Sequence, residues 1–312
     1  MVVLNTAEAW CALDFPVDRL ALLDDFATIQ GLTWQAQATA SVDQRIRPRA
    51  TLDWAVVPLR APNGDPDRTD PGLPGEEYGP TPLLERLPGL SRLLATIPCE
   101  LAAARLMRLA PEAQVKPHVD SFFGLQYGKV RLHVPLITSH TALMVFGKDE
   151  IHWTPDHLWY GDFSRPHTVR NGGPDDRVHL VLDCLLSGEL LALFPEEHRT
   201  GQIMINRSRL TPPPAPPLPP GEYPLMVARR ALDWTRSDSP ELDQPVAVTL
   251  LVGPEGGALR MPSGVLAKLH AVGDGHYRVG RMPEETTVRL GAGQVDIVRR
   301  VGDCSTVHPC SW

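Results

Sequence analysis

Alternating apolar and polar positions dominate the middle of the chain, from residue 101 to residue 184. The runs are short and are separated by Gly, Pro and Asp, which is typical of β-strands joined by turns. The predicted strands are residues 101–109, 130–136, 142–146, 151–153, 158–160, 167–170 and 177–184. Because no helical pattern interrupts them, they indicate a β-sandwich or a jelly roll.

Helical patterns flank this β region on both sides. Apolar residues recur at near-helical spacing within residues 16–34, which predicts an amphipathic helix packed outside the core sheet. Thr81 followed by Pro82 predicts a second helix start, and Pro88 is expected to break or kink that helix. Residues 185–198 are expected to form a helix that closes the domain.

One more strand and a long loop lie between these helices. Residues 54–59 predict a strand, and Pro58 predicts that it lies at a sheet edge or near a strand end. Residues 62–80 are dense in Gly, Pro, Asp and Glu. A loop of that length is either disordered or functional, for example as a lid over a site.

A proline-rich segment marks a domain boundary after the β region. Residues 211–221 predict a stiff, extended linker because seven of the eleven are proline. The expected parts are a domain of residues 1–205, a linker of 206–221 and a small domain of 222–312. The elements predicted in the small domain are strands at 246–252 and 288–298 and a short helix at 263–272. We therefore expect an α+β fold there, with a winged helix as one candidate.

The composition is that of a globular protein and excludes some partners. The chain has 312 residues, of which 43% are hydrophobic, and a net charge of -7. That charge argues against general nucleic-acid binding and against polybasic membrane binding, because both need a positive field. The N-terminus has no basic segment followed by an apolar one, and no apolar run is long enough to cross a bilayer, so we expect a cytoplasmic protein.

The five cysteines are odd in number and scattered, which does not resemble a disulfide framework. We expect reduced thiols. Cys304 and Cys310 flank His308 near the end of the sequence, so a zinc site or a disulfide there is an alternative.

Three residues in the β region are candidate metal ligands. Residues i and i+2 of a strand point to the same side, so His118 and Asp120 can face one metal, and His167 would come from a distant strand. Two histidines and a carboxylate form the facial triad of non-haem Fe(II) oxygenases, which leaves three coordination positions open. A lone His-x-Asp also arises by chance, so the interpretation depends on what surrounds it.

Two arginines are predicted to share this environment. Alternation puts Arg177 and Asp183 on one face of the strand at 177–184, and Arg131 shares a face with His133. A buried arginine is costly unless it meets an anion, and its planar fork matches a carboxylate. A dicarboxylate that chelates iron at one end and pairs with an arginine at the other fills open coordination positions of the metal. It also supplies the anion that a buried arginine needs. The alternative is that the two arginines merely pair with Asp183 or Glu150.

Five segments together resemble the aspartyl/asparaginyl β-hydroxylase family, which includes bacterial free-proline hydroxylases. They are Ala104-Arg105-Leu106-Met107-Arg108-Leu109-Ala110-Pro111, Pro117-His118-Val119-Asp120, Arg131-Leu132-His133-Val134-Pro135-Leu136, Gly161-Asp162-Phe163-Ser164-Arg165-Pro166-His167 and Arg177. The resemblance covers residues 54–185. It implies a mainly β fold, with a double-stranded β-helix (jelly-roll or cupin-like) core and flanking helices.

The resemblance also implies roles for named residues. His118, Asp120 and His167 would bind Fe(II), and Arg177 would hold the distal carboxylate of 2-oxoglutarate. Arg131 and His133 match the family's Arg-x-His, which also contacts the cosubstrate. The implied activity is a hydroxylase that consumes dioxygen and 2-oxoglutarate and forms succinate and CO2.

Substrate recognition is predicted just outside these motifs. Arg105 and Arg108 are candidates for gripping a substrate carboxylate, with surface salt bridges as the alternative. Phe122, Phe123 and Tyr127 are candidates for covering the substrate, with ordinary loop packing as the alternative. The expected substrate is an amino acid, free or within a peptide, with proline, asparagine and aspartate-like compounds first.

Two other functions are alternatives. A cupin-like metalloenzyme that does not use 2-oxoglutarate explains the metal ligands but gives Arg177 no purpose. A non-enzymatic interaction protein would act through residues 222–312, which are also candidates for contact with a peptide, a carrier protein or a second subunit of a homodimer.

Overall fold

The structure is a computed structural model, and it describes most of the sequence. The described ranges are residues 8–29, 31–40, 46–48, 53–72, 76–206, 218–233, 239–253, 256–273, 275–280, 282–283, 285–291, 293–302 and 304–312. The chain divides into two compact units, residues 1–72 with 77–205 and residues 73–76 with 206–312. The expected linker at 206–221 lies largely outside the described residues, so each unit is described by itself.

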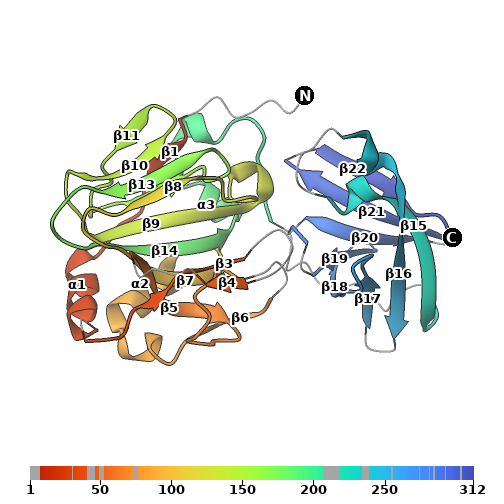
Figure 1. Ribbon diagram of the computed structural model, residues 1–312, viewed down its shortest axis with the longest axis horizontal. Helices are drawn as coiled ribbons and strands as arrows, with labels where there is room; N and C mark the ends of the chain where they lie inside the picture. The colour runs from red at the N-terminus through yellow and green to blue at the C-terminus, as the bar shows by residue number, and fades with distance from the viewer. Residues whose placement is uncertain are drawn as a thin grey trace. The chain divides into compact units, whose positions relative to one another are not determined.

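Two antiparallel sheets face each other in the first unit (Figure 1). The larger sheet has the order β1-β12-β9-β14-β7-β5-β2, with β6 also paired to β5, and the smaller has the order β11-β10-β13-β8. The strands are β1 (Trp10–Leu13), β2 (Gln35–Ala36), β5 (Trp54–Pro62), β6 (Tyr78–Pro80), β7 (Glu100–Leu109), β8 (Gln114–His118), β9 (Lys129–Ile137), β10 (Ala142–Phe146), β11 (Asp149–Ile151), β12 (Leu158–Gly161), β13 (His167–Asn171) and β14 (Arg177–Leu185). A separate pair is formed by β3 (Ala38–Ala40) and β4 (Ile46–Pro48). This arrangement confirms the expected double-stranded β-helix.

Strand alternation gives the larger sheet two different faces. On β14, the side chains of Val178, Leu180 and Leu182 pack into the main hydrophobic core. Arg177 and Asp183, which flank this run at alternate positions, lie on the inner face, as the alternation predicts. The same period of two therefore builds an apolar outer face for stability and a polar inner face for chemistry.

Helices α1 (Arg19–Thr28) and α2 (Pro88–Thr96) contribute to the core on the outer face. Asp25 of α1 is buried, and its carboxylate accepts a hydrogen bond of 2.7 Å from the backbone N–H of Leu90 in α2. A Cβ at Gly89 would lie 2.6 Å from the carbonyl oxygen of Ala21, so only glycine permits this close approach. Pro88 begins α2 instead of breaking a helix, because the first helical position needs no N–H donor.

Two further predictions about this unit are wrong. Pro58 does not lie on an edge strand, since β5 pairs with β7 on one side and with β2 and β6 on the other. Proline is tolerated because the register shifts at Pro58 on the β7 side, and on the other side β2 and β6 pair with different parts of β5. Residues 185–198 form only α3 (Gly188–Leu191) and the 3-10 turn η3 (Glu196–His198), with Pro195 between them.

The second unit is a meander of eight consecutive antiparallel strands. They are β15 (Gly221–Ala228), β16 (Pro245–Gly253), β17 (Gly256–Arg260), β18 (Leu266–Gly273), β19 (His276–Val279), β20 (Thr286–Gly291), β21 (Gln294–Val301) and β22 (Cys304–Pro309). Met226 of β15 exchanges backbone hydrogen bonds of 2.7 and 2.9 Å with Ser311, which links the first strand to the end of the chain.

The expected α+β fold of this unit is therefore wrong. The helix predicted at 263–272 is largely strand β18, in which exposed Leu266 and Lys268 alternate with buried Ala267 and Leu269. Ala, Lys and Leu favour helices locally, but pairing on both sides decides the outcome. In the described part of the chain, no helix has the length and apolarity that a bilayer crossing requires.

Helix α1 offers a matched test of the outer core. Leu22 is 1% exposed and Leu20 is 74% exposed. We expect Leu22→Ala to lower the free energy of unfolding by about 2–4 kcal/mol, because it leaves a cavity. Leu20→Ala should change it by about 0.5 kcal/mol or less. Urea unfolding followed by circular dichroism measures both, and equal losses would contradict this packing.

Candidate metal and anion site

The two candidate histidine ligands lie opposite each other in the smaller sheet. His118 of β8 and His167 of β13 are register partners, and their ring centroids are 4.3 Å apart. Asp120 lies two residues beyond the end of β8, and its backbone N–H donates a 2.9 Å hydrogen bond to the carbonyl oxygen of Phe163. One ligand atom from each of the three residues lies within 4.8 Å of the others. The fold thus brings together the three residues that the sequence indicated.

Both histidines are oriented by hydrogen bonds to their own backbone segments. The Nδ1 atom of His118 lies 2.9 Å from the carbonyl oxygen of Lys116, and that of His167 lies 2.9 Å from the carbonyl oxygen of Arg165. A neutral imidazole that donates from Nδ1 presents an Nε2 lone pair, which is the usual arrangement in a metal-binding histidine. Burial lowers the pKa of His167 to about 4, so this ring is neutral near pH 7. The donor set therefore fits a divalent transition metal.

The segment before His167 is fixed by crowding and by hydrogen bonds. A Cβ at Gly161 would lie 2.9 Å from ring atoms of Phe146 and Phe163, so glycine is required there. Asp162 is buried, and its carboxylate accepts hydrogen bonds of 2.6 Å from the Ser164 hydroxyl and 3.0 Å from Arg165 Nε. These contacts give Gly161, Asp162 and Ser164 structural roles in placing His167.

Arg177 is buried without a carboxylate partner among the described residues. Its Nη2 lies 3.0 Å from Nδ1 of His179 and 3.6 Å from the sulfur of Met144, and its Nε has no described hydrogen-bond partner. Burial alone lowers its pKa to about 9, which leaves it a cation near pH 7. An uncompensated buried cation favours an anionic ligand.

Arg131, unlike Arg177, is paired with carboxylates. Its Nε lies 2.7 Å and its Nη2 3.1 Å from the two carboxylate oxygens of Asp183, and its Nη1 donates to Asp120 in a close contact. The alternative prediction, in which an arginine pairs with Asp183, therefore describes Arg131. Glu150 pairs with Arg170, at 2.5 Å, and not with Arg177.

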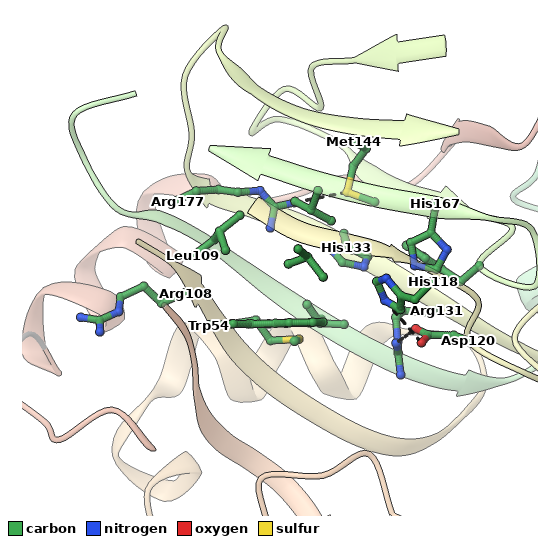
Figure 2. A pocket seen from close by; sticks show the side chains of 15 residues that line it. Trp54, Arg108, Leu109, His118, Asp120, Arg131, His133, Met144, His167 and Arg177 are labelled. Carbon is green, nitrogen blue, oxygen red and sulfur yellow. Dashed lines mark hydrogen bonds and ion pairs between the residues drawn. The ribbon is translucent and has the colours of Figure 1, made fainter. Parts of the chain in front are cut away.

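A cavity joins the metal-ligand cluster to Arg177 (Figure 2). It spans about 470 Å³ of space not filled by protein atoms, part of it open to solvent. Its walls are Trp54, Met107, Arg108, Leu109, Val115, His118, Asp120, Arg131, His133, Met144, Phe163, His167, Val169, Arg177 and Val181. Both ring nitrogens of His133 are buried and have no partner among the described residues, so they are available to a ligand in this cavity.

The five predicted substrate contacts lie elsewhere, with one exception. Arg105 is 1% exposed and donates to Asp183 at 3.1 Å, while Phe123 packs 4.1 Å from the guanidinium of Arg131. Phe122 and Tyr127 pack against each other with ring centroids 5.7 Å apart. Of the five, only Arg108 lines the cavity.

The Arg108 side chain nevertheless points away from the cavity in Figure 2. It lies over the ring of Trp34 and 3.5 Å from Asp176. The salt-bridge alternative therefore describes Arg108 better than a grip on the substrate does.

Sequence reasoning missed two parts of the site. Trp54 was predicted only as part of a strand, yet it lines the cavity with its ring centroid 6.1 Å from that of His118. His179 received no role from the sequence, and its Nδ1 accepts a hydrogen bond from Arg177. Its position two residues after Arg177 on the same strand face was the available signal.

The alternative zinc site near the C-terminus does not form among the described residues. Cys304 begins β22 and Cys310 follows its last residue, so roughly 20 Å of extended strand separates them. All five cysteines are free in the structure.

Comparison with known proteins identifies the first unit. The sequence model of a family described as Aspartyl/Asparaginyl beta-hydroxylase matches residues 21–186, which is more than half of the chain. Similar solved structures include an oxidoreductase of the 2OG-Fe(II) oxygenase family from Burkholderia pseudomallei, with 14% identity, a TM-score of 0.32 and coverage of 46% of this chain and 73% of that one. Another is a prolyl hydroxylase from Trichoplax adhaerens, in complex with a hypoxia inducible factor peptide fragment, with 12% identity, a TM-score of 0.37 and coverage of 62% and 90%.

Metal binding tests the His-Asp-His cluster directly. We expect His118→Ala, Asp120→Ala and His167→Ala each to weaken Mn(II) binding by more than about tenfold, because even the loss of an outer-shell partner costs about 10–100-fold. His140→Ala, at an exposed histidine outside the cluster, is the control and should bind Mn(II) like the wild type. Isothermal titration calorimetry gives the affinities, and unchanged binding by the His167 variant would refute the assignment.

Proposed function

Because the chain belongs to the aspartyl/asparaginyl β-hydroxylase family, we propose that it is an Fe(II)- and 2-oxoglutarate-dependent dioxygenase. Its substrate in this proposal is an amino acid, free or within a peptide, which it hydroxylates. Succinate and CO2 would be the products of the cosubstrate. Family membership supports the oxidoreductase class, and the amino-acid substrate is the finer part of the proposal.

One observation carries the proposal. The cavity that contains the His-Asp-His cluster also contains Arg177, a buried cation without a carboxylate partner among the described residues. A ligand with two carboxylates fits this arrangement, because one end can reach the metal while the other pairs with the guanidinium. The cupin-like alternative leaves the charge of Arg177 uncompensated, so the geometry favours use of 2-oxoglutarate.

In this proposal His118, Asp120 and His167 would hold the iron, as the facial triad of non-haem Fe(II) oxygenases does. The bound iron supplies the oxidising power for attack on an unactivated C–H bond. The protein's own residues bind and orient the two substrates and limit the access of water.

Neutral groups anchor Arg177. Burial keeps the pKa of His179 well below its ordinary value, with the nearby Arg177 and His133 lowering it further, so its ring accepts a hydrogen bond without contributing a charge. Met144 likewise offers only a neutral sulfur. These contacts orient the guanidinium but leave its positive charge to the distal carboxylate of the cosubstrate. His133, whose pKa burial also lowers strongly, can donate a further hydrogen bond to a carboxylate oxygen.

The rest of the cavity wall supports an aliphatic group as the site of hydroxylation. Trp54, Leu109, Val115 and Val169 all line the cavity and offer no charge. The desolvation free energy of an aliphatic ring or side chain, such as that of proline, against this wall is less unfavourable than that of an aspartate side chain. We therefore place proline, free or peptidyl, ahead of acidic substrates.

Arg177→Met tests the cosubstrate site. Removal of one partner of a buried charge pair costs about 2–5 kcal/mol, so 2-oxoglutarate should bind the Mn(II)-loaded variant at least about thirtyfold more weakly. Mn(II) affinity itself should not change, since Arg177 does not touch the metal ligands. Arg170→Met, which removes an arginine of the exposed pair with Glu150, is the matched control. If wild-type protein binds Mn(II) but not 2-oxoglutarate, the cupin-like alternative is correct.

A turnover screen tests the substrate class. Wild-type protein with Fe(II), 2-oxoglutarate and dioxygen should convert a proline-type substrate to a product one oxygen heavier, with succinate formed in equal amount. Mass spectrometry of both products across free amino acids and peptides provides the measurement, and the His167→Ala variant supplies the blank. Turnover of aspartate with none of proline would overturn the order proposed here.

A further inference from the structure

We infer that Asp183, acting through Arg131, is a positioning residue that fixes which carboxylate oxygen of Asp120 faces the metal. The inference rests on the proposed function, because it concerns the iron site of that function. It gives Arg131 a role different from the cosubstrate contact that the family resemblance implies.

Asp183 is fully buried and uses both of its oxygens. Oδ1 accepts from Arg131 Nε at 2.7 Å, and Oδ2 accepts from Nη2 atoms of Arg131 and Arg105, each at 3.1 Å. Burial raises the pKa of this carboxyl, but the two arginines lower it by more, so it remains an anion. Asp183 therefore binds the Nε and Nη2 edge of the Arg131 guanidinium with both carboxylate oxygens.

The remaining sides of Arg131 are also constrained. The ring of Phe123 packs on it with its centroid 4.1 Å away, and that of Phe163 lies at 5.9 Å. Only Nη1 extends towards the metal-ligand cluster, where it donates to Oδ2 of Asp120. A guanidinium held in this way cannot turn without breaking the bidentate pair with Asp183.

This chain of contacts assigns different tasks to the two oxygens of Asp120. Oδ2 accepts from Arg131, while Oδ1 lies 3.7 Å from Nε2 of His118, the nitrogen left for a metal. The carboxylate is thereby restricted to binding a metal through one oxygen. Binding through both would occupy one more coordination position, which the cosubstrate and dioxygen need.

A purely structural role for Asp183 is the competing explanation, since removing one partner of a buried pair destabilises a fold by about 3–5 kcal/mol. A double-mutant cycle separates the structural role from the positioning role, because the effects of two residues that act through one another on metal affinity are not additive. If Asp183 acts through Asp120, removing the Asp183 carboxylate weakens metal binding only while Asp120 is present.

The experiment measures the affinity for Mn(II) alone, by calorimetry, in Asp183→Asn, Asp120→Ala and the double variant. We expect Asp183→Asn to weaken binding by about 10–100-fold, as loss of an outer-shell partner does. In the Asp120→Ala background the same change should alter the affinity by about twofold or less. Asp176→Asn, which removes the charge of a carboxylate paired with Arg108, is the control and should bind Mn(II) like the wild type.

Arg131→Lys provides a second route if Asp183→Asn does not fold. Lysine keeps the charge of the cluster but cannot bridge two carboxylates in a fixed plane. It too should weaken Mn(II) binding by about tenfold, and only when Asp120 is present. Wild-type affinity in a folded Asp183→Asn or Arg131→Lys protein overturns the inference, as does an equal loss in the Asp120→Ala background. Failure of the wild type to bind Mn(II) would instead overturn the proposed function.

Discussion

The burial of charge on the inner face of the larger sheet is the constraint on which the site depends. Arg105, Arg131 and Asp183 lie there with almost no solvent contact, and in such an environment each charge needs a partner. Ion pairs join these three and Asp120, so two positive charges meet two negative ones. Arg177 lies on the same face without a carboxylate among the described residues, held by His179 and Met144. The cavity therefore contains the His-Asp-His cluster, supported by paired charges, and one cation, Arg177, without an anionic partner among the described residues.

The stability of the first unit comes largely from the other face of the same strands. Val130, Leu132, Val134 and Leu136 of β9 and the corresponding residues of β14 share one apolar core with α1 and α2. A single change of register would exchange the two faces and place charges against the helices. The apolar side chains on the outer face therefore stabilise the sheet. They also fix the register that makes the charged side chains point inward.

Periodicity in the sequence predicted the longer strands β5, β7, β9 and β14, as well as β10, β12 and β13, because a period of two is visible locally. It also predicted the inner position of Arg177 and Asp183, but it did not predict β1, β2, β6 or β8. It did not reveal that His118 and His167 are register partners, since strand pairing depends on the whole sheet. Phe123 was a candidate for covering the substrate, whereas a tertiary contact places it on Arg131. The second unit was mispredicted because the Ala, Lys and Leu of residues 266–269 favour a helix when taken alone.

The strand order also determines when each unit can be completed during synthesis. In the second unit every strand pairs with its neighbours in sequence, so its sheet can grow strand by strand as the chain emerges. In the first unit β1 pairs with β12, so residues 10–13 find their partner only about 150 residues later. Until β12 is made, the edge of β1 remains open and exposed to mispairing. The first unit is therefore the part of this chain whose nascent form most depends on protection from aggregation.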